Sequence, residues 1–94
     1  MQSKISVSIQ IPSILQQFTG GQRIIEAEGQ NIGQCLDYME RQFQGIKQGL
    51  CDEKGRLFIY MHIYVKGERA YPEELTMPIN AGDELIILPA IMGG

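Results

Sequence analysis

One helical pattern, from Asn31 to Phe43, most constrains how this chain can fold. The apolar residues that recur there at helical spacing are Ile32, Cys35, Leu36, Met39 and Phe43. Such a stripe is typical of a helix with one apolar face. Asn31 is a favourable N-cap residue, and Gln34 completes a capping-box pattern. We expect the helix to cover one face of a sheet, which leaves the other face to water or a partner.

Strand-like segments lie on both sides of the predicted helix. Residues 5–11 alternate between apolar and polar side chains, which is typical of a half-buried strand, and Pro12 ends the run. We expect a second strand at about residues 22–28. Further strands are predicted at residues 57–65, 69–71 and 84–88, where β-forming residues are frequent. The order β-β-α-β-β-β predicts the α+β class.

Length and composition are consistent with one domain spanning residues 1–94. The net charge is −3 and lysine and arginine are not clustered, so we expect no binding to nucleic acid. The chain shows neither a signal-peptide pattern nor an apolar run of membrane-spanning length. We therefore expect a cytoplasmic protein that does not bind a membrane.

The two cysteines are expected to be free thiols rather than metal ligands, because two are too few for a zinc or iron–sulfur site. Cys35 lies in the helical stripe and is interpreted as a small buried hydrophobic residue. Cys51 lies in a long predicted connection, residues 44–56, and is a candidate for an exposed thiol.

The C-terminal residues are the candidate functional site of the chain. The last predicted strand is followed by Pro89-Ala90-Ile91-Met92-Gly93-Gly94. Ordering two glycines costs more backbone entropy than ordering other residues, and a slot too narrow for side chains would require them. The α-carboxylate of Gly94 is ionised at neutral pH. We predict that this carboxylate is the reactive group and that Gly93, which also lacks a side chain, helps it to pass through such a slot. Residues 89–94 would form a tail, and the rest of the chain would be the scaffold that presents it.

These features resemble the ThiS/MoaD family of sulfur-carrier proteins, which have the ubiquitin-like β-grasp fold. The segments that carry the resemblance are the turn and strand at residues 81–88, Pro89-Ala90, the terminal Gly93-Gly94, and residues 62–68. The resemblance implies a mixed sheet of four to five strands packed on one main helix. It also implies that the first and last strands lie side by side and parallel at the centre.

The resemblance further implies a chemistry for Gly94. An adenylating enzyme of the MoeB/ThiF type would use ATP and Mg²⁺ to form an acyl-adenylate, and a sulfur donor would replace AMP to leave a thiocarboxylate. The chain would be a protein cosubstrate rather than an enzyme and would bind no cofactor itself, since it has no P-loop. The acceptor stays open between the large subunit of molybdopterin synthase, a cysteine synthase and a thiazole synthase. The length and the Leu-Pro-Ala ending are closer to MoaD and its cysteine-pathway relatives than to short thiazole carriers.

Four side chains are predicted to share the uncovered sheet face: His62, Tyr64, Ile86 and Leu88. One interpretation is a docking patch for partner proteins, extended by Pro89, Ile91 and Met92. The other is a set of scattered surface apolar residues, which are common. Similarly, Glu68, Asp83 and Glu84 form either an acidic rim that steers a basic partner or a set of solvated turn residues.

Two other functions remain open from the sequence. The chain could be a ubiquitin-like modifier that is joined to lysines through Gly94. It could also be a β-grasp interaction module whose tail has no chemistry.

Overall fold

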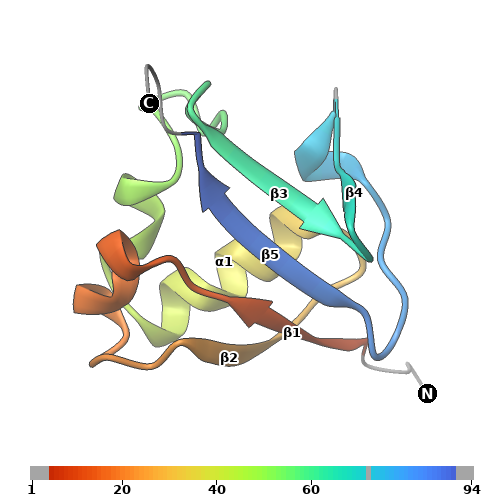
Figure 1. The fold of residues 1–94 in the computed structure, drawn as a ribbon, viewed down its shortest axis with the longest axis horizontal. Helices are drawn as coiled ribbons and strands as arrows, with labels where there is room; N and C mark the ends of the chain where they lie inside the picture. The colour runs from red at the N-terminus through yellow and green to blue at the C-terminus, as the bar shows by residue number, and fades with distance from the viewer. Residues whose placement is uncertain (1–4, 72, 91–94) are drawn as a thin grey trace.

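The structure, a computed structural model, describes residues 5–71 and 73–90. The strands are β1 (Ser6–Gln10), β2 (Ile24–Glu28), β3 (Met61–Val65), β4 (Glu68–Arg69) and β5 (Glu84–Pro89). The α-helix is α1 (Ile32–Gln42), and the short 3-10 helices are η1 (Ser13–Phe18), η2 (Ile46–Gly49) and η3 (Glu74–Thr76). The predicted α+β arrangement is confirmed, because one main helix lies against a five-stranded mixed sheet (Figure 1).

The sheet has the strand order β2-β1-β5-β3-β4. β1 and β5 pair in parallel, with Ser8 opposite Glu84 and Gln10 opposite Ile86. β5 also pairs with β3, and this pairing is antiparallel. The expected parallel neighbours at the centre are therefore confirmed. The last strand of the chain is held from both sides.

Helix α1 begins where the sequence predicts. The side chain of Asn31 accepts a hydrogen bond from the backbone N–H of Gln34 at 2.8 Å, which satisfies one of the unpaired donors of the first turn. The Gln34 side chain in turn accepts from the N–H of Gln30, the residue before the cap, at 2.8 Å. Of the predicted stripe, Phe43 is partly buried and the other members are fully buried.

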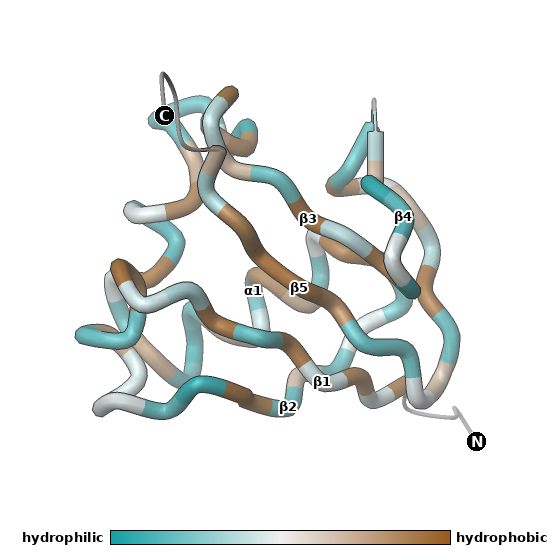
Figure 2. Tube along the Cα trace, in the orientation of Figure 1, coloured by the Kyte–Doolittle hydropathy of each residue, from teal (hydrophilic) through white to brown (hydrophobic). Residues whose placement is uncertain are grey.

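The core lies between α1 and one face of the sheet. Along β5, Leu85 and Ile87 are buried, and along β3 the same is true of Met61 and Ile63. Their neighbours in sequence point to the opposite face, as the period of a strand requires. Figure 2 shows the hydrophobic middle of β5 between the flanking strands.

The prediction of a strand over residues 57–65 is wrong in its first half, since β3 begins only at Met61. The N–H of Phe58 donates to the carbonyl of Leu50, and the N–H of Met61 donates to the carbonyl of Phe58, both at 2.9 Å. The second bond closes a turn with Ile59 and Tyr60 at its corners. A strong β-forming sequence is thus overridden by its tertiary contacts.

The interpretation of Cys51 as an exposed thiol is also wrong, because its side chain is buried. Cys51 forms an isolated bridge with Leu57, and its N–H donates to the carbonyl of Lys47 at 2.8 Å. These contacts fold the connection back onto the domain. Both cysteines are free thiols.

Candidate functional site

The first two residues of the predicted tail, Pro89 and Ala90, are bonded to β3 and to the turn before it. Pro89, the last residue of β5, lies opposite Met61. The N–H of the following residue, Ala90, donates to the carbonyl of Tyr60 at 2.5 Å. The chain is therefore held by backbone contacts up to Ala90, four residues before Gly94.

Pro89 ends the strand, as predicted. Successive N–H groups along a strand point to opposite sides. Because the N–H of Ala90 points to β3, the nitrogen of Pro89 faces the side of β1. Pairing with β1 ends three residues earlier, at Ile86, so the missing N–H of proline leaves no partner unsatisfied. Proline can thus end β5 without weakening its pairing.

The predicted reactive and tail residues Ile91, Met92, Gly93 and Gly94 lie outside the described residues. Their roles therefore remain predictions. The structure does give the place from which they continue, which is the end of the central strand β5, beside the beginning of β3 (Figure 1).

The structure brings together the four side chains predicted on the uncovered face. His62 lies opposite Leu88, and Tyr64 lies opposite Ile86, as neighbours on β3 and β5. Helix α1 packs on the other face, through its buried stripe. We call His62, Tyr64, Ile86 and Leu88 the open-face patch. Leu88 is its most exposed member, at 47%.

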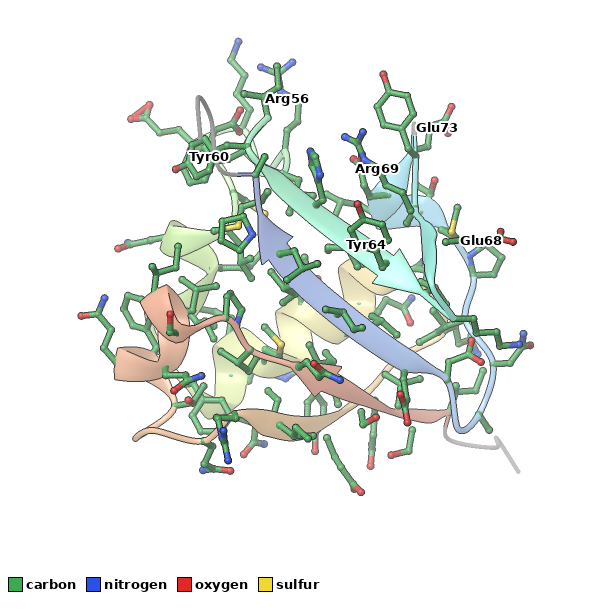
Figure 3. The ribbon with its side chains drawn as sticks, in the orientation of Figure 1. Arg56, Tyr60, Tyr64, Glu68, Arg69 and Glu73 are labelled. Carbon is green, nitrogen blue, oxygen red and sulfur yellow. The ribbon has the colours of Figure 1, made fainter. Side chains whose placement is uncertain are left out.

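The open-face patch continues toward both edges of the sheet with polar and charged neighbours. Gln10 of β1 lies opposite Ile86, and Arg69 of β4 lies opposite Tyr64. The Arg69 guanidinium lies 4.6 Å from the centre of the Tyr71 ring, in a cation–π contact. Figure 3 shows Tyr64 on β3 with Arg69 beside it on β4. An apolar centre with a polar surround is the general arrangement of a protein interface.

Asp83 is neither part of an acidic rim nor a solvated turn residue, so both interpretations from the sequence are wrong for it. Its side chain is only 5% exposed. One carboxylate oxygen accepts a hydrogen bond from the N–H of Asn80 at 2.8 Å, and the other lies 3.4 Å from the Lys66 ammonium group. Asp83 thus stabilises the turn before β5. Glu68 and Glu84 are exposed, so any acidic rim contains only these two of the three predicted residues.

Buried thiols are poor nucleophiles because the thiolate is disfavoured away from water. Burial raises the pKa of Cys35 to about 11. Burial also raises the pKa of Cys51, an effect that the nearby Lys47 partly opposes. Neither thiol is therefore suited to accept or transfer sulfur.

The described part of the chain holds no group of three or more His, Cys, Asp or Glu side chains that could bind a metal ion. Among residues 5–71 and 73–90, no helix has the length and apolar character needed to span a membrane.

The fold and the central position of the last strand define the class of ubiquitin-like β-grasp proteins, and comparison with known proteins agrees. The family model of the ThiS family matches residues 9–94. The chain is 36% identical to the sulfur carrier protein CysO of Mycobacterium tuberculosis over 93 residues, which cover 96% of this chain and 100% of that protein. The chain belongs to the ThiS family, and its resemblance to the ThiS/MoaD sulfur carriers is confirmed.

Solved structures give the same result for the fold. A chain in the crystal structure of the Amycolatopsis orientalis BexX/CysO complex is 36% identical, with a TM-score of 0.85 over 94% of this chain and 99% of that one. Small archaeal modifier protein 1 of Haloferax volcanii is 23% identical, with a TM-score of 0.79 over 95% of this chain and 99% of that chain, and this likeness concerns the fold alone.

The sequence did not predict the turn at Phe58–Met61, although this turn is bonded to Ala90 at the start of the tail. The residues carry no glycine, proline, asparagine or aspartate that would indicate a turn. The bond that closes the turn, from Met61 to Phe58, is local, but the bonds that hold the turn in place, from Ala90 to Tyr60 and from Phe58 to Leu50, join it to other segments.

Proposed function

We propose that this protein carries sulfur as a thiocarboxylate on Gly94. A carboxylate is a poor electrophile, so its oxygen first attacks the α-phosphorus of ATP, which releases pyrophosphate and gives an acyl-adenylate. Hydrosulfide then attacks the carbonyl carbon; a C–S bond forms, the bond to AMP breaks, and no electrons are gained or lost. The adenylating enzyme supplies the nucleotide site and Mg²⁺.

The observation that carries this proposal is the family match, which extends through residue 94. The geometry adds a physical reason. The tail continues from the central strand β5, whose last residues are bonded to β3 and to the turn before it. A scaffold that fixes Pro89 and Ala90 in this way reduces the entropy that a partner must remove when it positions the residues that follow.

We further propose that the open-face patch, with Pro89, Ile91 and Met92, contacts the adenylating enzyme and the sulfur acceptor. Its members are partly exposed apolar and aromatic side chains on β5, which leads to the tail, and on the neighbouring strand β3. A partner that binds there and receives the tail contacts one continuous surface. Aromatic and apolar residues at a desolvated centre contribute most of the energy of such contacts.

Among the acceptors that the sequence leaves open, we favour an enzyme of the cysteine-synthase class. The support is the 36% identity to sulfur carrier proteins named CysO, over almost the whole of both chains. A molybdopterin or thiazole synthase is the alternative acceptor. The loaded carrier is incubated with each class of synthase and that synthase's own substrate, and the mass of the carrier is then measured. Only with the true acceptor does the thiocarboxylate sulfur bond to the substrate, so the carrier appears as a covalent adduct or, once water has cleaved the acyl–sulfur bond, as the carboxylate.

Intact-mass spectrometry tests the central proposal. The full chain is incubated with the adenylating enzymes of its own organism, ATP, Mg²⁺ and sodium sulfide. We expect a mass gain equal to the exchange of one oxygen for one sulfur, which disappears without ATP and in the variant Gly94→Ala. No gain with any of the enzymes would contradict the proposal. Gly-Gly remnants on lysines of other proteins would then favour the ubiquitin-like modifier.

A further inference from the structure

The turn at Phe58–Met61 has an unusual tip. Its two corner residues are Ile59 and Tyr60, closed by the bond from the Met61 N–H to the Phe58 carbonyl at 2.9 Å. Ile59 is 92% exposed and Tyr60 is 44% exposed, and Ile59 has the highest exposure among the large hydrophobic residues that the structure describes.

Neither backbone preference nor burial explains an isoleucine at this position. Turn corners favour Gly, Pro, Asn, Asp and Ser, whereas branched side chains favour strands. At 92% exposure the side chain gains almost no stability from packing. Single exposed apolar residues are common on proteins. An apolar residue that also conflicts with its local backbone, however, is expected mainly at functional sites.

The tip is held at a fixed position relative to Pro89 and Ala90, where the tail begins. The Tyr60 carbonyl accepts the Ala90 N–H at 2.5 Å, and Met61 lies opposite Pro89. The rings of Phe58 and Tyr60 stack with their centres 5.1 Å apart and their planes 9° apart, which stiffens the turn. Figure 3 shows Tyr60 at the end of the sheet where β5 finishes.

The surface beside the tip leaves room for a partner. Ile59 borders an open cavity of about 760 Å³, whose lining also includes Leu57, Met61, Tyr71 and Leu75. A partner that receives the tail therefore meets Ile59 next to the exit of β5, with accessible space around its side chain.

We propose that Ile59 is a docking residue for the adenylating enzyme, and that it inserts into an apolar pocket of that enzyme near the mouth of its active-site slot. This inference rests on the proposed function, because the enzyme that accepts the Gly94 carboxylate is the partner. The backbone bond between Tyr60 and Ala90 then sets the spacing between the docked side chain and the tail. Docking of Ile59 thereby aligns the tail with the slot.

The test uses the variant Ile59→Asn in the full chain. Asparagine suits a turn corner, so the melting temperature should stay the same or rise, whereas a structural role for Ile59 would lower it. The rate of pyrophosphate release is measured against carrier concentration with the adenylating enzyme that loads the wild-type chain. We expect KM for the carrier to rise about tenfold, since a docked apolar anchor is lost, with kcat within about twofold of the wild type.

The matched control is Ile14→Asn, because Ile14 is also an exposed isoleucine, at 52%, but lies in η1 rather than in the turn bonded to the tail. Its KM should stay within about twofold of the wild type. An unchanged KM in Ile59→Asn, or an equal rise in both variants, would overturn this inference while leaving the proposed function intact.

Two other outcomes also decide the matter. Sedimentation that shows a dimer of the wild type, lost in Ile59→Asn, would make the tip a contact between copies and overturn the docking role. A wild-type chain that no adenylating enzyme of its organism activates would overturn the proposed function and the inference together.

Discussion

Replacement of Leu88 by alanine should weaken the binding of the adenylating enzyme by a factor that follows from the exposure of Leu88. Complete burial of a leucine contributes about 1.5–3 kcal/mol, so covering the exposed 47% contributes about 0.7–1.4 kcal/mol. Because about 1.4 kcal/mol corresponds to a tenfold change, the dissociation constant should rise about three- to tenfold. Because most interface substitutions change the dissociation rate rather than the association rate, most of this loss should appear as faster dissociation.

Isothermal titration calorimetry of the full chain with its adenylating enzyme measures this change, and thermal unfolding reports whether the fold is preserved. The matched control is Ile24→Ala, since Ile24 is 60% exposed but lies on β2, the edge strand beyond β1. Its dissociation constant should change by less than about twofold. An unchanged constant for Leu88→Ala, or an equal loss in the control, would show that the patch is not where the enzyme binds.

Two further predictions concern buried and bonded groups away from the tail. The Glu40 carboxylate accepts the N–H groups of Gly45 and Lys47, both at 2.9 Å, and these bonds lower the pKa of Glu40. Glu40→Gln should therefore lower the free energy of unfolding by about 1 kcal/mol at pH 7. The difference in this free energy between the variant and the wild type should shrink as the pH falls below about 4.3 and through the lower native pKa of Glu40. Urea unfolding at several pH values measures it, and a difference that stays constant with pH would contradict the prediction. The raised pKa of Cys35, about 11, predicts that iodoacetamide at pH 8 modifies it far more slowly in the native chain than in urea, as followed by mass spectrometry. Equal rates would show that Cys35 is accessible.

The open-face patch could be predicted from the sequence because side-chain direction in a strand alternates by residue. Once residues 62–65 and 84–88 are taken as strands, His62 and Tyr64 must share one face, and Ile86 and Leu88 must do the same. The register observed between β3 and β5 brings these two pairs together on the uncovered side. The N-cap at Asn31 was equally predictable, because its hydrogen bond is local.

The remaining features depend on contacts between distant residues. The stretch before β3 has strong β-forming character, yet Phe58 bonds to Leu50 and Tyr60 bonds to Ala90, and these contacts make a turn. The buried Asp83 carboxylate is paired with Lys66, which follows the neighbouring strand β3, and with Asn80 in its own turn. The contact between Asn80 and Asp83 is local, but the others join residues at least eight positions apart. The turn before β3 and the ion pair of Asp83 with Lys66 therefore become visible only in the structure.

The parallel pairing of β1 with β5 joins residues 8–10 to residues 84–86, almost the whole length of the chain apart. During synthesis, the centre of the sheet therefore stays incomplete until β5 has left the ribosome. A nascent chain that stops earlier lacks half of the open-face patch and all of the tail. The order of the strands thus couples the assembly of the open-face patch to the synthesis of residues 84–88, so that patch and sheet centre are completed together.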